Sequence, residues 1–170
     1  MKYRFAAILA LIIVIGVFAY HSGFKNLSTQ SPDIKLMGLD EKMHHLSEYI
    51  GNGKWTIVNI WGPKCPACIE EIPDLVLFHE AHYETDATVL GIALDFPSYG
   101  YADLEEVTEF TDSYFIDYPM LLADGEITTQ LGANRLKGTP TILAFNPDGE
   151  LVGEHVGIIT KDGIEEFISK

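Results

Sequence analysis

The chain has only two cysteines, Cys65 and Cys68, and they form a C-x-x-C pattern. A disulfide between them would close a loop too short to remove much entropy from the unfolded chain, so a purely structural disulfide is the weaker of two interpretations. The stronger is a dithiol/disulfide switch, in which one thiolate attacks a partner disulfide and the second cysteine resolves the mixed disulfide. The pattern therefore predicts thiol–disulfide exchange.

The segments on either side of the cysteines predict how they are positioned. An apolar run rich in β-branched residues, 55–60, predicts a buried strand before them. A helix is predicted from Pro66 to about Tyr83, and Pro66 lies in its first turn, where a missing N–H costs little. Cys65 should therefore lie at the amino end of a helix, where backbone N–H groups and the helix dipole stabilise a thiolate.

The rest of the chain predicts an α/β domain with a central mixed β-sheet flanked by helices. Strand and helix patterns alternate in the first half, which indicates parallel strands with helices on both faces. The turn sequence Asn146-Pro147-Asp148-Gly149 indicates an antiparallel hairpin near the end. The further predicted elements are strands at 34–39, 88–94, 118–122, 141–145 and 151–156 and helices at 103–114 and 160–169.

The amino terminus has the pattern of a membrane segment. Lys2 and Arg4 precede the uncharged apolar run Phe5–Tyr20, which is slightly shorter than the span of about 20 residues that crosses a bilayer. We interpret residues 1–21 as a signal anchor, with a signal peptide cleaved near Ala19 as the alternative. The positive-inside rule then places the amino terminus in the cytoplasm.

This interpretation sets the expected domain organisation and location. The polar segment 22–32 is predicted to be a tether, and residues 33–170 form the folded domain. An uncleaved anchor would hold this domain on the outer face of the cell membrane or in the periplasm, whereas cleavage would leave it periplasmic or secreted.

The overall charge excludes one class of partner. The chain has 25 acidic residues against 11 lysines and arginines, and its net charge is −14. Such a surface repels nucleic acid, so no nucleic-acid partner is expected. It would suit basic partners, although solubility alone accounts for it.

A longer motif surrounds the cysteine pair. It reads Trp-x-x-x-Cys-Pro-x-Cys-x-x-Glu-x-Pro-x-Leu over residues 61–75, and Gly138-Thr139-Pro140-Thr141 follows about seventy residues later, directly before a predicted strand. With the amino-terminal segment, this combination resembles the membrane-tethered thiol–disulfide oxidoreductases of bacteria, the TlpA/ResA-like family, which includes the cytochrome c maturation thioredoxins. The resemblance covers roughly residues 33–170 and implies a thioredoxin-like fold.

The resemblance implies roles for the cysteines and for the residues that face them. Cys65 would be the exposed attacking thiol and Cys68 the buried resolving thiol. Glu71 would be a buried acid beneath them that modulates thiol pKa and proton transfer, although an ordinary acid of the first helical turns is the alternative. Pro140 would be cis and face the disulfide, and the backbone of Thr139 would pair with the substrate.

Four further positions complete the expected site. Trp61 would pack beside the cysteines and, with Pro66, form part of the substrate-binding surface. Asn59 stands where thioredoxins proper keep a buried Asp. Lys64 departs from the family, many members of which have Trp at this position; its ammonium could lower the pKa of Cys65 and would alter the partner-facing surface.

The expected function is an extracytoplasmic protein-disulfide reductase that needs no cofactor beyond the Cys65–Cys68 disulfide. Cytochrome c maturation is one expected setting, and a transmembrane thiol reductase is the expected electron donor. No metal is expected, because a zinc site needs four ligands and there is no second cysteine pair. A thiol peroxidase is disfavoured, because Gly62 rather than Thr stands three residues before Cys65. The alternative is a non-catalytic thioredoxin-fold adaptor or metal chaperone.

Overall fold

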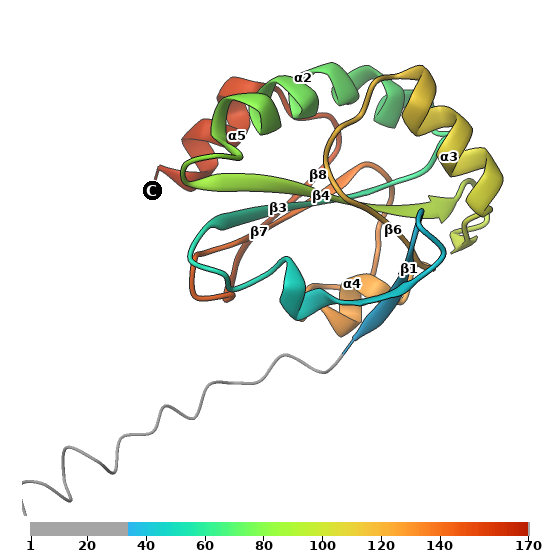
Figure 1. Ribbon diagram of the computed structural model, residues 1–170, viewed down its shortest axis with the longest axis horizontal. Coiled ribbons are helices and arrows are strands. Elements are labelled where there is room, and N and C mark those ends of the chain that lie inside the picture. Colours follow the sequence, from blue (N-terminus) through green and yellow to red (C-terminus); the bar gives the residue numbers. More distant parts are fainter. Residues whose placement is uncertain (1–33, 170) are drawn as a thin grey trace, which may run out of the picture. The chain divides into compact units, whose positions relative to one another are not determined.

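The computed structural model describes residues 34–169, which form one mixed β-sheet with helices on both faces (Figure 1). The strands are β1 (Lys35–Gly38), β2 (Met43–His45), β3 (Trp55–Trp61), β4 (Ala87–Asp95), β5 (Gly100–Tyr101), β6 (Met120–Leu122), β7 (Thr141–Phe145) and β8 (Leu151–Val156). The helices are η1 (Leu46–Glu48), α2 (Pro66–His82), α3 (Leu104–Ser113), α4 (Ile127–Gln130) and α5 (Lys161–Ile168).

The strand order is β2-β1-β6-β4-β3-β7-β8, with β5 paired to β4 outside this path. Strands β3, β4 and β6 are parallel, whereas β7 pairs antiparallel with β3 and β8 antiparallel with β7. The predicted parallel half and carboxy-terminal hairpin are therefore confirmed. Strand β3 is flanked on both edges and covered on both faces, which explains its almost continuous apolar sequence.

The helices divide unequally between the two faces. Helices α2, α3 and α5 cover one face, and α4 lies on the other (Figure 1). The connections β3–α2–β4 and β4–α3–β6 step in the same direction across the sheet, so right-handed crossovers place both helices on the same face. Side chains of β3 alternate accordingly: Ile57 and Trp61 pack in the cluster with α2, and Val58 and Ile60 pack in the opposite cluster.

The ends of several elements follow from local sequence. The Asp103 carboxylate accepts a hydrogen bond from the Glu106 N–H at 2.9 Å and begins α3, and the Thr160 hydroxyl accepts one from Gly163 at 3.2 Å and begins α5. Both are N-caps that satisfy free helical N–H groups. In the β7–β8 hairpin, Gly149 has φ +84°, a conformation that glycine adopts without steric cost.

Two features differ from the sequence expectation or lie beyond it. The short strand β5 forms in a segment that has the pattern of a loop, because the chain after β4 doubles back along that strand. The predicted membrane segment 1–21 and tether 22–32 lie outside the described residues. Within residues 34–169 no helix combines the length and apolarity that crossing a bilayer requires.

Candidate active site around the Cys65–Cys68 disulfide

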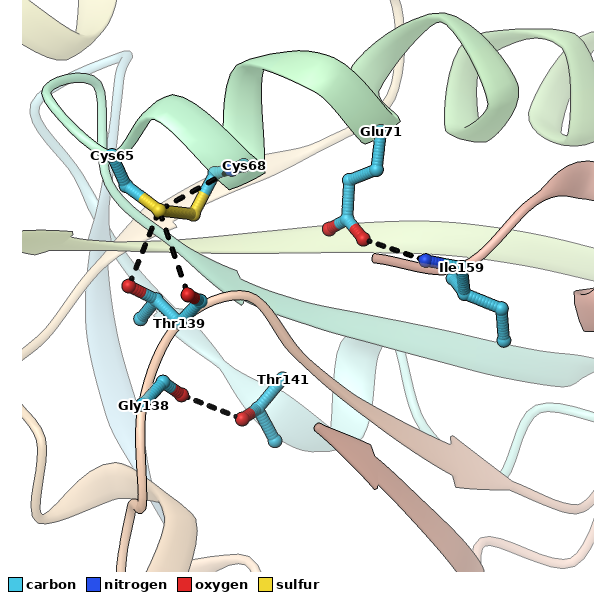
Figure 2. Close-up of a disulfide and its surroundings, with 7 residues drawn as sticks. All are labelled: Cys65, Cys68, Glu71, Gly138, Thr139, Thr141 and Ile159. Carbon is cyan, nitrogen blue, oxygen red and sulfur yellow. Dashed lines mark hydrogen bonds between the residues drawn. A yellow bond between two sulfur atoms is a disulfide. The ribbon is translucent and has the colours of Figure 1, made fainter. Parts of the chain in front are cut away.

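Cys65 and Cys68 are joined by a disulfide at the amino end of α2, with a Cα–Cα distance of 5.2 Å (Figure 2). Cys65 is the N-cap of the helix, and its Sγ accepts a hydrogen bond from the Cys68 N–H at 3.2 Å. The predicted position of Cys65, between the end of β3 and the start of α2, is confirmed. The N–H group and the helix dipole at this point favour negative charge on the sulfur, so a thiolate is stabilised after reduction.

The segment before β7 lies against the disulfide (Figure 2). The Thr139 hydroxyl donates to Cys65 Sγ at 3.4 Å, and the Thr139 carbonyl oxygen lies 3.6 Å from the same sulfur. The Thr139–Pro140 peptide bond is cis, as the resemblance implied. Because β7 pairs with β3, residues 74 positions apart in the chain meet at the sulfur.

The expected exposure of Cys65 has to be corrected. Its residue is only 1% exposed and Cys68 is fully buried. The physical reason is that Thr139 lies on Cys65 Sγ and takes up part of the approach to it. In this oxidised state an incoming thiolate must displace that contact.

Glu71 is a buried acid rather than a surface acid of the first helical turns. Its side chain is inaccessible, Oε2 accepts a hydrogen bond from the Ile159 N–H at 3.3 Å, and Oε1 has no partner within the described residues. Burial raises the pKa of Glu71 to about 8, against the opposing effects of the Ile159 N–H and the nearby Asn59 amide. Glu71 stands one helical turn after Cys68, so both side chains lie on the same face of α2.

Trp61 does not offer a surface to a substrate, so its expected substrate-binding role is corrected to packing. The ring is 1% exposed, its Nε1–H donates to Met120 Sδ at 3.0 Å, and its centroid lies 4.9 Å from that of Phe110. Trp61 is the last residue of β3, and its side chain packs in the core cluster under α2. Pro66 is exposed at the first turn of α2 and remains available to a partner.

Lys64 is exposed, and its charge is partly balanced by a neighbouring carboxylate. Its Nζ forms an ion pair with Glu106 Oε2 on α3 at 2.7 Å, and this carboxylate raises the pKa of Lys64. The neighbouring negative charge offsets the influence that the ammonium would have on a thiolate. That the Lys64 ammonium lowers the pKa of Cys65 stays a prediction, and the ion pair with Glu106 indicates that the effect is small.

Sequence reasoning missed two residues of this region, Glu106 and Tyr118. Glu106 reads as one of several acidic residues on a solvated helix face, and nothing in the sequence links it to Lys64. Tyr118 reads as the start of a core strand; it is 4% exposed and its pKa is raised by burial and by the charge of Glu71. The sequence gives no signal for either contact, because both depend on how α3 and β6 pack.

Comparison with known proteins agrees with this geometry. The thiol-disulfide oxidoreductase ResA of Halalkalibacterium halodurans is 26% identical over 168 residues, covering 95% of this chain and 90% of that protein. ResA of Geobacillus kaustophilus is 24% identical over 170 residues, with 97% and 92% covered.

Solved structures share the fold. A thiol:disulfide interchange protein of the thioredoxin family from Chlorobium tepidum superposes with a TM-score of 0.69 at 25% identity, over 82% of this chain and 92% of that one. A DsbF homologue from Corynebacterium diphtheriae gives a TM-score of 0.68 at 23% identity, over 80% and 82%. The predicted thioredoxin-like fold is thereby confirmed. Residues 27–153 match the AhpC/TSA family, and the chain belongs to that family.

Proposed function

We propose that this chain reduces disulfide bonds in partner proteins outside the cytoplasm. Its relatives are thiol–disulfide oxidoreductases, and the chain has the C-x-x-C pair that this reaction requires. The chain is therefore a thiol–disulfide oxidoreductase. The observation that carries the proposal is the Cys65–Cys68 disulfide at the amino end of α2, where a backbone N–H meets the sulfur that would attack.

The reaction starts from the dithiol. The Cys65 thiolate attacks one sulfur of a partner disulfide, a Cys65–partner S–S bond forms, and the other partner sulfur leaves and takes a proton from solvent. Cys68 then gives its proton to the Glu71 carboxylate and attacks Cys65 Sγ, and the second partner sulfur leaves and takes a proton from solvent. Two electrons pass to the partner, the chain is left with the Cys65–Cys68 disulfide, and Glu71 holds the proton that came from Cys68.

Glu71 is suited to this step by its environment. A proton acceptor works best when its pKa lies near the working pH, and burial raises the pKa of Glu71 to about 8. Near neutral pH the group therefore exists in both protonation states. A surface glutamate, with an ordinary pKa, would be a weaker base and would accept the proton of Cys68 less readily.

The residues between the cysteines support the proposed direction of the reaction. Pro66 and Ala67 include no histidine to stabilise the Cys65 thiolate strongly, so we expect a reduction potential of about −200 to −270 mV, as in glutaredoxins and thioredoxin. A strong oxidant that installs disulfides would instead have a potential near about −120 mV.

The location and partners extend this proposal. Lys2, Arg4 and the apolar run Phe5–Tyr20 support a membrane anchor with the domain outside the cytoplasm. There the dithiol would have to be restored by an electron donor, for which a transmembrane thiol reductase is suited, because outer compartments are generally oxidising. Cytochrome c maturation is the proposed setting, and no metal or further cofactor is proposed.

The deciding experiment is a titration of the 170-residue chain against glutathione redox buffers, followed by turnover of a disulfide-containing protein. We expect one reversible two-electron transition in the stated range and turnover that Cys65→Ser abolishes. A potential near that of a strong oxidant would reverse the direction. Failure to cycle, with no effect of Cys65→Ser, would support the adaptor or metal-chaperone alternative.

The structure also bears on thiol peroxidase activity. A side chain at Gly62 would place its Cβ 2.7 Å from the Leu94 carbonyl oxygen, so this position has no room for the Thr whose absence disfavours that activity. We therefore expect no turnover of hydroperoxides above the background rate of a cysteine-free variant. Peroxide consumption coupled to thiol oxidation is the measurement.

A further inference from the structure

Three buried polar atoms lie unpaired behind the disulfide. They are Nδ2 and Oδ1 of Asn59 and Oε1 of Glu71, which meet no hydrogen-bond partner among residues 34–169. Asn59 lies on β3 between Ile57 and Trp61, so the alternation of the strand directs it toward α2. Buried polar groups in proteins are almost always paired, and exceptions commonly mark ordered water or a functional site.

Tyr118 is a further buried polar residue, which lies between Asn59 and the edge of the sheet. It is 4% exposed, and its ring lies 5.7 Å from the ring of His79, centroid to centroid. The pKa of Tyr118 is raised by burial and then by the charge of Glu71, and is lowered by the Asn59 amide. The same amide lowers the pKa of Glu71. The geometry agrees: Asn59 pairs with Gly91 across β3 and β4, and a Cβ at Gly91 would lie 3.3 Å from Tyr118 Cε2, so the amide lies near the phenol ring.

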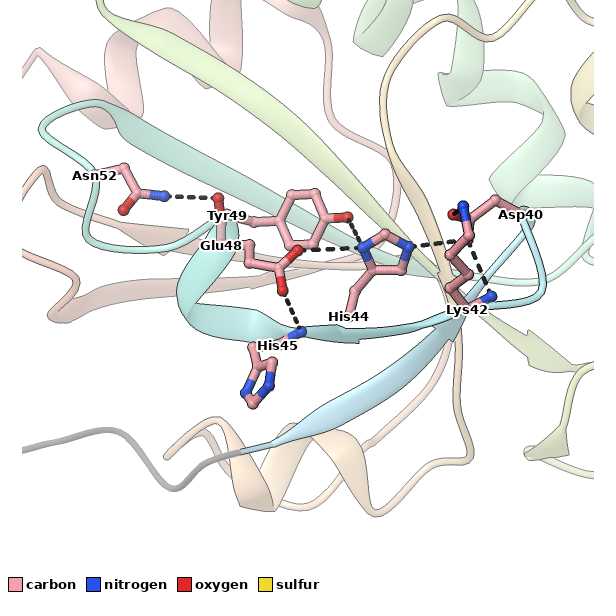
Figure 3. A network of polar contacts seen from close by, with 7 residues as sticks. All are labelled: Asp40, Lys42, His44, His45, Glu48, Tyr49 and Asn52. Carbon is pink, nitrogen blue, oxygen red and sulfur yellow. Dashed lines mark hydrogen bonds and ion pairs between the residues drawn. The ribbon is translucent and has the colours of Figure 1, made fainter.

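Tyr118 also lines a cleft of about 310 Å³ at the sheet edge. The cleft lies between the turn that joins β1 to β2 and the segment that joins α3 to β6, and Asp40, His44 and Tyr49 contribute to its wall. Figure 3 shows His44 held between Asp40 and Glu48 in this region. Tyr118 thus borders both the buried polar atoms and this cleft.

We propose that Asn59 and Tyr118 are positioning residues that hold water against Glu71 and carry its proton to this cleft. The inference rests on the proposed function and adds the route by which the proton leaves. Glu71 has no surface exposed to solvent, so the proton taken from Cys68 needs a route through neighbouring groups to leave the molecule.

The transfer is balanced and involves no electrons. Protonated Glu71 gives its proton to the buried water and becomes a carboxylate, the water passes a proton to the Tyr118 oxygen, and the Tyr118 hydroxyl gives its own proton to water in the cleft. Asn59 orients the water and the carboxylate through its amide and carries no proton itself. The titratable groups that face this path are Cys68 and Asp74 on α2; beside Tyr118 they are Asp117 and His79, and in the wall of the cleft they are Asp40, His44 and Tyr49.

The test uses the reduced 170-residue chain with 5,5′-dithiobis(2-nitrobenzoate), whose two thiolates are released in turn. The first release reports attack by Cys65, and the second reports resolution by Cys68. We expect Tyr118→Phe to leave the first phase unchanged and to slow the second by about tenfold, which is less than the roughly 10²–10⁴-fold typical of general acid–base catalysis because part of the path remains. Tyr83→Phe is the matched control, since the hydroxyl of this exposed residue donates a hydrogen bond to Glu84 on the surface.

A second readout separates proton positioning from packing. The carboxylic C=O band of Glu71, assigned with Glu71→Gln, is titrated by infrared spectroscopy. Asn59→Leu removes the amide that favours the carboxylate, so the band should persist to higher pH than in the wild type. Asn59→Ser serves if the leucine variant does not fold.

The outcomes distinguish the two proposals. If the second phase of Tyr118→Phe matches that of the wild type and Tyr83→Phe at every pH, the route through Tyr118 is overturned, while the exchange function stands. An unchanged Glu71 titration in the Asn59 variant overturns the role of Asn59. If the wild type itself shows no second release, the proposed function fails first.

Discussion

Two carboxyl groups in different regions of the chain are treated in opposite ways. Glu71 lies behind the disulfide, where Oε2 accepts a hydrogen bond from the Ile159 N–H, and burial raises its pKa to about 8. Asp40 lies on the surface between β1 and β2, where it accepts hydrogen bonds from His44 Nε2 at 2.9 Å and from the Lys42 N–H at 3.2 Å (Figure 3). The contact with His44, above all, lowers the pKa of Asp40 to about 2.

The difference shows that burial and pairing, not residue type, decide what an acid can do. Asp40 is fixed as an anion in a solvated network that ties the turn together. Glu71 lacks enough partners to remain charged in the core, so it can exchange a proton near neutral pH. The region around Asp40, in which the polar atoms are paired, has a structural role. The region around Glu71, in which some polar atoms are unpaired, is where the chemistry is expected.

The largest effect is expected from Cys68→Ser. The variant can still form a mixed disulfide through Cys65 but cannot resolve it, so turnover should fall to the background rate of thiol exchange while a covalent adduct accumulates. Mass spectrometry detects the adduct, and Cys65→Ser is the control that should form none. An adduct formed equally by both variants would show that Cys65 is not the attacking thiol.

Glu71→Gln tests the raised pKa of the buried carboxyl through its effect on the free energy of unfolding. The pKa of Glu71 is raised in the folded state, so between about pH 4.5 and 8 the folded state binds more protons and the free energy of unfolding falls as pH rises. The variant should lack this fall and exceed the wild type by about 3–5 kcal/mol at pH 8, with little difference near pH 5. Urea unfolding of the oxidised proteins at both pH values measures it. Parallel pH profiles would contradict the raised pKa.

Lys64→Met tests a charge that is exposed, like Asp40, but lies beside the disulfide. Because Glu106 already offsets its charge, removal should change the rate of Cys65 attack on an uncharged disulfide by less than about threefold, the range of exposed ion pairs. Glu106→Gln is the matched variant and should raise the rate slightly by freeing the ammonium. A tenfold loss in Lys64→Met would restore a direct role for Lys64.

The smallest effect is expected at His44. The pKa of His44 is raised, chiefly by Asp40, so its stabilising contribution is complete below about pH 6.5 and is lost as pH rises through the raised value. The contribution of Asp40 is present above about pH 4 and is lost as pH falls toward 2. His44→Gln should therefore lower the thermal midpoint slightly at pH 5.5, not at pH 9, with no change in the rate of attack by Cys65. A loss of the same size at both values would assign His44 a packing role.

The sequence by itself determined the features that depend on neighbouring residues. The C-x-x-C pair at a strand–helix junction, the caps at Asp103 and Thr160 and the turn before Gly149 each follow from a few adjacent positions, because hydrogen bonds and φ preferences act locally. The position of Thr139 and Pro140 opposite the disulfide was available only through the family resemblance, since no local pattern links them to Cys65.

Only the tertiary structure decided burial and pairing at the site. Thr139 covers Cys65 from 74 residues away, and Glu106 pairs with Lys64 from 42 residues away. Whether Trp61 faces a partner or the core, and whether the charge of Glu71 acts on Tyr118, depends on how α2, α3 and β6 pack on the sheet. These contacts set the dielectric surroundings and charge partners of each group, and a pKa responds to those surroundings rather than to sequence neighbours.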